Sequence, residues 1–86
     1  MLLNVANINV ADNLLMNKQY LQKFAKHLKK LRKEKGVLMD DFLTVEGISR
    51  STIGMVETVK TDITLSKIKI IADTLGVHPK ELLNFE

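Results

Sequence analysis

The chain has no cysteine, and aromatic residues make up only 5% of its 86 residues. Without cysteine there can be no disulfide framework and no thiolate metal site, which fits the cytoplasmic location that we expect. Because aliphatic residues supply most of the apolar content, the composition favours packed helices over a β-sandwich or barrel. The length allows one modest hydrophobic core. The sequence therefore predicts a single all-α domain.

Long apolar runs are also missing. The first ten residues are apolar in character, but three asparagines, Asn4, Asn7 and Asn9, interrupt them and no positively charged segment precedes them. No stretch is long enough to cross a bilayer. We therefore expect neither a targeting segment nor a membrane partner.

The residues that usually carry enzyme chemistry are few. His27 and His78 are the only histidines, the carboxylates are scattered singly, and the chain has no glycine-rich phosphate loop and no nucleophile elbow. We expect a protein that is not an enzyme and that has no cofactor, no metal and no small-molecule substrate.

Positive charge is concentrated in one stretch although the net charge is only +3. Between residues 18 and 35 the sole acid is Glu34, against eight basic residues: Lys18, Lys23, Lys26, Lys29, Lys30, Arg32, Lys33 and Lys35. Such a stripe can follow phosphates or an anionic membrane surface, or it can be a solvated helix face that keeps the protein soluble.

The apolar spacing predicts five helices. The first spans about residues 13–35, with Asp12 as N-cap, Gly36 just beyond its end and a buried face of Leu14, Leu21, Phe24, Leu28 and Leu31. The second spans about residues 39–46, with Val37 and Phe42 as apolar anchors and with Asp40 and Asp41 at its positive end, and Gly47 ends it.

The other three helices carry clear caps. Ser49 caps a helix that turns Ile53 and Val56 inward and ends at about Glu57, and residues 59–63 form a loop. Thr64 caps a fourth helix, which Gly76 ends and whose buried stripe is Leu65, Ile68, Ile71, Ala72 and Leu75. Pro79 begins a fifth helix that runs through Leu83.

The first residues do not fit this bundle, so we divide the chain into an N-terminal arm or extension (1–12) and a helical domain (13–86). The arm alternates imperfectly between apolar and polar residues, and a lone strand is not stable in water. It packs on the domain, pairs with another chain, or is an upstream extension of a protein that naturally begins at Met16. The sequence leaves these three alternatives open.

Two short helices joined by the Gly47 turn form the unit that places its second helix in a DNA major groove. Three stretches strengthen this interpretation: Leu28-Lys-Lys-Leu-Arg-Lys-Glu-Lys-Gly36, Gly47-Ile-Ser-Arg-Ser-Thr-Ile53 followed by Val56-Glu57, and Ile71-Ala-Asp-Thr-Leu-Gly-Val77 with Pro79-Lys-Glu-Leu-Leu83. Over about residues 18–84 the chain resembles the Cro/CI (XRE) helix-turn-helix family. The resemblance implies a compact five-helix bundle of the lambda-repressor-like type, working as a dimeric transcription regulator on double-stranded DNA.

The resemblance also implies roles for individual residues. Arg32 and Glu57 stand where the family has an ion pair between its first and third helices, and two parallel hydrogen bonds would lock those helices together. Arg50, Ser51 and Met55 match groove-facing positions, with Thr52 beside them, and Arg50 can bind guanine through two hydrogen bonds. Ser49, Lys60 and Thr61 are expected to contact the DNA backbone.

Three residues depart from the family pattern. Met39 replaces a glutamine that usually contacts DNA, and Gly54 weakens the third helix by about 1 kcal/mol relative to alanine. Val59 replaces a glycine after that helix, and because a β-branched residue disfavours positive φ, we expect this loop to differ from the family form. Met39, Gly54 and Met55 leave open an alternative function, a protein-interaction module such as an antitoxin or accessory regulator.

Apolar residues near the C-terminus suggest how two copies would associate. Ile70 lies off the buried stripe of its helix. Leu82, Leu83 and Phe85, in and just after the last helix, are more apolar groups than one short terminal segment can hide. We therefore expect a homodimer with Ile70, Leu82 and Phe85 at or near the centre of its interface.

Overall fold

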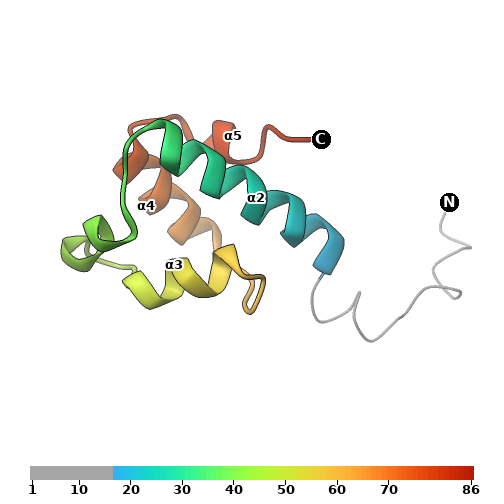
Figure 1. Ribbon diagram of the computed structural model, residues 1–86, viewed down its shortest axis with the longest axis horizontal. Coiled ribbons are helices and arrows are strands. Elements are labelled where there is room, and N and C mark those ends of the chain that lie inside the picture. The colour runs from blue at the N-terminus through green and yellow to red at the C-terminus, as the bar shows by residue number, and fades with distance from the viewer. Residues whose placement is uncertain (1–16) are drawn as a thin grey trace, which may run out of the picture.

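The structure is a computed structural model that describes residues 17–86, and the elements of this part of the chain are all helices (Figure 1). Its elements, in order, are α2 (Lys18–Glu34), the 3₁₀ helix η2 (Met39–Thr44), α3 (Arg50–Glu57), α4 (Leu65–Leu75) and α5 (Pro79–Leu82). The predicted all-α fold is confirmed for these residues. The predicted arm, the Asp12 cap and Leu14 lie outside them.

Helix α2 begins at Lys18, later than the predicted start near residue 13, because Asn17 caps it. The Asn17 side chain accepts a hydrogen bond of 3.1 Å from the backbone N–H of Tyr20. One face of the helix is buried, through Leu21, Phe24, Ala25, Leu28 and Arg32. At the other end Gly36 has φ +70°, as predicted for the residue that follows a helix and turns the chain away from it.

The second helical segment is shorter than predicted and ends at Thr44. It is a 3₁₀ helix, closed by i→i+3 bonds such as Asp41 N–H to Leu38 C=O, 3.0 Å. Phe42 anchors it in the core, and the Asp41 carboxylate accepts a 2.7 Å hydrogen bond from the backbone N–H of Leu38. The predicted anchor and the predicted acidic first turn are therefore both present.

Gly47 shapes the turn that follows. Its φ is +86°, and a Cβ at this position would lie only 2.7 Å from Cδ1 of Ile70. Both the backbone conformation and the space thus favour glycine here. The same contact shows that Ile70 packs under the turn, so it is half-buried and does not project freely from α4 as the sequence analysis expected.

The predicted caps of α3 and α4 are confirmed. Ser49 Oγ accepts from the backbone N–H of Thr52 at 3.0 Å, and Thr64 Oγ1 accepts from that of Lys67 at 3.2 Å. The predicted stripe of α4 holds except at Leu65, which is 80% exposed. As the first residue of α4, Leu65 lies beyond the end of the core that the later turns of the helix cover.

The core lies where α2 crosses α3 and α5, with α3 against η2 and α4 against α5 (Figure 1). Its buried members come from every element: Phe24, Leu28, Phe42, Ile48, Ile53, Val56, Ile68, Ile71, Ala72, Leu75 and Leu82. The short helices η2 and α3 are each held on one side by this core, which leaves their other sides free.

The loop after α3 has a conformation that the sequence analysis did not expect. Val59 has φ +59°, and hydrogen bonds run from its N–H to Val56 C=O (3.1 Å) and from Lys60 N–H to Met55 C=O (2.8 Å). The same pair of bonds follows α2, where Gly36 stands in the place of Val59. The prediction of a different loop is therefore wrong, because these two bonds hold valine in the conformation that suits glycine.

Candidate nucleic-acid interface

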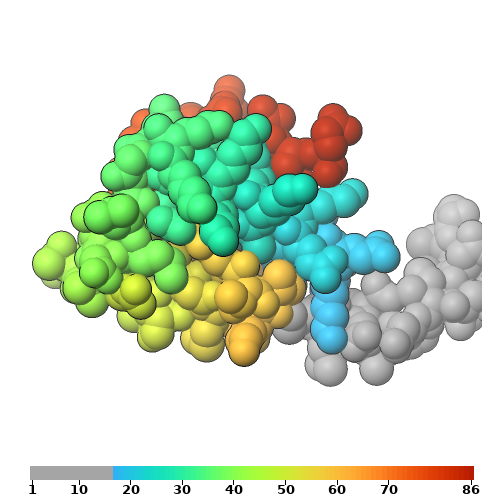
Figure 2. All heavy atoms as spheres, in the orientation of Figure 1, coloured from blue at the N-terminus to red at the C-terminus, as the bar shows by residue number. Residues whose placement is uncertain are grey.

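Helix α3 has one face in the core and one face open to solvent. Ile53 and Val56 are buried, whereas Arg50, Ser51 and Met55 are exposed and Thr52 is half-buried. In Figure 2 the side chains of α3 (yellow) form a free lower edge of the molecule beside η2 (green). The turn at Gly47 thus presents a short helix whose outer face carries the residues proposed from the sequence to read DNA bases.

The start of α3 is fixed by two hydrogen bonds between Ser49 and Thr52. Besides capping the helix, Ser49 Oγ lies 2.8 Å from Thr52 Oγ1. This second bond holds Thr52 against the cap. Ser49 itself is exposed at the helix N-terminus, a position where backbone N–H groups favour an anion such as a phosphate.

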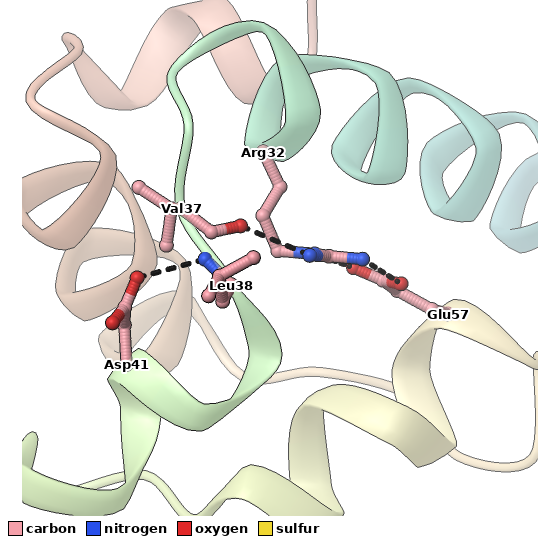
Figure 3. Close-up of polar contacts among 5 residues, drawn as sticks. All are labelled: Arg32, Val37, Leu38, Asp41 and Glu57. Carbon is pink, nitrogen blue, oxygen red and sulfur yellow. Dashed lines mark hydrogen bonds and ion pairs between the residues drawn. The ribbon is translucent and has the colours of Figure 1, made fainter.

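The end of α3 is fixed by a buried ion pair with α2. Arg32 Nε donates to Glu57 Oε2 at 2.7 Å and Nη2 donates to Oε1 at 3.1 Å. Figure 3 shows the guanidinium between this carboxylate and the carbonyl of Val37, which accepts a third bond of 2.9 Å from Nη1. The ion pair expected from the sequence is therefore present, and it also ties down the chain that enters η2.

Arg50, the first residue of α3, has an acidic partner that the sequence analysis missed. Its Nε donates to Oδ1 of Asp40 on η2. The sequence analysis assigned Asp40 only to the helix dipole, because nothing in the local pattern links residues ten positions apart across a turn. The ion pair joins the two short helices on their exposed side.

Met39 and Gly54, two of the departures from the family pattern, meet each other. A Cβ on Gly54 would lie 3.5 Å from Cε of Met39, so the methionine packs over the bare backbone of α3. Met39 is thus partly buried against the core. This contact lies within the fold, between η2 and α3, and the outer face of α3 is left to other residues.

The loop between α3 and α4 carries the remaining residues proposed from the sequence. Lys60 is exposed and Thr61 is half-buried, directly after the turn at Val59. A different group of basic residues, Lys23, Lys26 and Lys30 of α2, lines a hollow of about 560 Å³ together with His27 and residues 84–86. These three lysines therefore border the C-terminal segment.

Both histidines have structural partners. The His27 imidazole Nε2 donates to the backbone carbonyl of Glu81 at 2.6 Å and so joins α2 to α5. His78 is the N-cap of α5, where Nδ1 accepts a 3.1 Å bond from the backbone N–H of Lys80. Within residues 17–86 no group of three or more His, Cys, Asp or Glu side chains could hold a metal ion.

The residues expected at a dimer interface lie in different environments. Leu82 has 0% exposure, and its expected place in an interface is therefore wrong, because the core of its own chain already covers it. Ile70 is half-buried under the Gly47 turn. Phe85 is half-buried, and its ring packs on Tyr20, Phe24 and His27. Leu83, the residue after Leu82, is 41% exposed, and Tyr20 is 49% exposed.

A fold of this kind, with two short helices at a tight turn and the outer face of the second left open, defines a helix-turn-helix protein. The helix-turn-helix family HTH_3 matches residues 28–82. The chain therefore belongs to this family, the Cro/CI (XRE) type of DNA-binding transcription regulators. None of the helices in residues 17–86 has the length and apolar character needed to cross a membrane.

Two solved structures are similar to the described chain. The restriction-modification controller protein C.AhdI from Aeromonas hydrophila is 34% identical, with a TM-score of 0.66 over 72% of this chain and 94% of that one. A hypothetical transcription factor, NHTF, from Neisseria is 28% identical, with a TM-score of 0.66 over 80% of each chain. No curated protein matches the sequence.

Proposed function

We propose that this protein is a sequence-specific transcription regulator that binds a two-fold DNA operator as a dimer, with α3 in the major groove. The observation that carries the proposal is the outer face of α3, which exposes Arg50, Ser51 and Met55 while its two ends are fixed. A rigid helix with a free polar face is what base readout in the major groove needs.

Each exposed residue has a chemically defined role in this proposal. Arg50 donates two hydrogen bonds to O6 and N7 of guanine, and Ser51 contacts a base or a phosphate. Met55 packs against an apolar edge such as a thymine methyl group. Ser49 and Thr52, which are bonded to each other, face the DNA backbone at the start of the helix.

Arg50→Ala tests the base-reading role. We expect the variant to lose about 1–3 kcal/mol of binding free energy and to relax the preference at one base pair in each half-site. The measurement is a competition assay with duplexes selected on the wild-type chain from a pool with a randomised centre. If affinity and preference both stayed unchanged, Arg50 would not read a base.

Lys60→Ala tests the backbone contacts that we assign to Lys60 and Thr61. Because a phosphate contact acts on all sequences alike, binding should weaken uniformly and the log–log slope against salt should flatten by about one unit. Lys23→Ala, on the surface beside the C-terminal segment, is the control. An equal change of slope in both variants would contradict a specific role for Lys60.

A protein-interaction module is the alternative function. It takes support from Leu38 and Leu43, two apolar side chains of the η2 region that are mostly exposed. The selection experiment separates the two functions, since a module of this kind would recover no preferred duplex.

A further inference from the structure

The ion pair between Arg50 and Asp40 lies at the exposed side of η2 and α3. The two side chains are 47% and 68% exposed, so solvent screens their attraction and the pair adds little to the stability of the fold. It differs in this respect from the buried pair of Arg32 and Glu57, whose side chains are 8% and 6% exposed.

The contact uses one particular nitrogen of Arg50. Within residues 17–86, the only hydrogen bond recorded for its side chain runs from Nε to Asp40 Oδ1. A guanidinium group has five N–H donors in one plane, and the four on Nη1 and Nη2 remain free. Those are the donors that approach O6 and N7 of guanine in a bidentate contact. Asp40 therefore binds Arg50 through Nε and leaves Nη1 and Nη2, the nitrogens that would contact the base, open.

The neighbouring acid does not share this role. Asp41 carries the same charge on the same helix, but its carboxylate accepts from the backbone N–H of Leu38 and points toward the start of η2 (Figure 3). The position of its carboxylate, and not its charge alone, therefore distinguishes Asp40 from Asp41.

We propose that Asp40 is a positioning residue, which orients the guanidinium of Arg50 so that the chain discriminates guanine in its operator. The proposal rests on the proposed function, since Arg50 must read a base for its orientation to matter. Free arginine side chains sample many rotamers, and a partner on Nε removes part of the entropy that base binding would otherwise cost. Asp40 also repels phosphates, so it favours Arg50 in the groove over Arg50 on the backbone.

Asp40→Asn and its matched control Asp41→Asn test this proposal. Each change removes one negative charge from η2. Asparagine at position 41 still accepts the bond from the neutral N–H of Leu38, whereas asparagine at position 40 loses the ionic attraction that holds the Arg50 guanidinium. The probes are the duplex selected on the wild-type chain and versions in which each G·C pair is replaced in turn by A·T. Asp40→Asn should reduce the discrimination at the position that Arg50 reads by about twofold to fivefold, the size of couplings between exposed ion pairs. Asp41→Asn should leave that ratio unchanged.

A double-mutant cycle completes the experiment. In an Arg50→Ala background, Asp40→Asn should no longer change the discrimination, because the group that it orients is gone. If Arg50→Ala relaxes one position and Asp40→Asn does not, or if both aspartate variants relax it equally, the positioning role is overturned while the DNA-binding function stands. If the wild-type chain selects no preferred duplex, the proposed function fails, and the role of Asp40 fails with it.

Discussion

Val59 is the residue with the least favourable backbone in the described chain. Among residues 17–86 it is the only non-glycine residue with positive φ, at +59°. The left-handed region costs an L-residue about 1–2 kcal/mol, and β-branching adds crowding at Cβ. Two hydrogen bonds from Val59 and Lys60 to the end of α3 hold the turn in this conformation. The strain lies directly before Lys60, which we propose as a phosphate contact.

We expect Val59→Gly to raise the free energy of unfolding by about 1 kcal/mol, because glycine adopts this conformation without a steric penalty. Thermal and urea unfolding measure the change. Gly36→Val is the reciprocal control: its φ is +70° and a Cβ there would meet no atom within 4 Å, so it should lower stability through the backbone alone. A loss of stability in Val59→Gly would show that the side chain contributes more through its contacts than its backbone costs.

At the scale of helices, local chemistry predicted much of the structure. The caps Ser49 and Thr64 could be predicted because their signal, a hydroxyl residue directly before an apolar period, lies within one helical turn. The 3₁₀ form of η2 and the exposure of Leu65 depend on where the core ends, which no local window contains. The contact of Asp40 with Arg50 likewise needs the angle of the turn between two helices. Family resemblance predicted the pairing of Arg32 with Glu57, which spacing alone does not reveal.

The Arg32 and Glu57 pair determines how α3 sits against α2. Arg32→Ala should lower the free energy of unfolding by about 3–5 kcal/mol, because it leaves a buried carboxylate without its partner. Urea unfolding followed by circular dichroism measures this loss. Lys69→Ala is the control, since its pair with Asp73 is exposed on α4 and should change stability by less than about 0.5 kcal/mol.

A second variant keeps this prediction testable if Arg32→Ala fails to fold. Replacing both Arg32 and Glu57 by methionine removes the two charges together, and it should be less destabilising than Arg32→Ala. If Arg32→Ala were as stable as Lys69→Ala, the buried pair would not be what holds α3 in place.

At the scale of the whole molecule, the proposed dimer needs an apolar surface that the core of the chain does not cover. Leu82 is buried in the core of its own chain, so it does not reach the expected interface, and Ile70 packs against the Gly47 turn. The apolar side chains left exposed near the C-terminus include Leu83, and Tyr20 on α2 is exposed beside the half-buried ring of Phe85. We propose that Leu83 meets its counterpart on a second copy in an isologous two-fold contact. Sequence patterns could not separate Leu82 from Leu83, because α5 is only one turn long and shows no apolar period.

We expect the wild-type chain to sediment as a dimer at micromolar concentration, and Leu83→Asp to shift it toward monomer, because a carboxylate on this surface would have to be desolvated between the two copies. Leu43→Asp places the same charge on an equally apolar exposed position of η2, and it should stay dimeric.

Phe85→Asp is less diagnostic, since Phe85 also packs within its own chain. A dimer would bring two copies of α3 to successive major-groove turns, about 34 Å apart on one DNA face, so Leu83→Asp should also weaken operator binding. A chain starting at Met16 tests whether residues 1–12 add to the contact. A monomeric wild-type chain would contradict the dimer, and a dimer that persists in Leu83→Asp would move the interface to another surface.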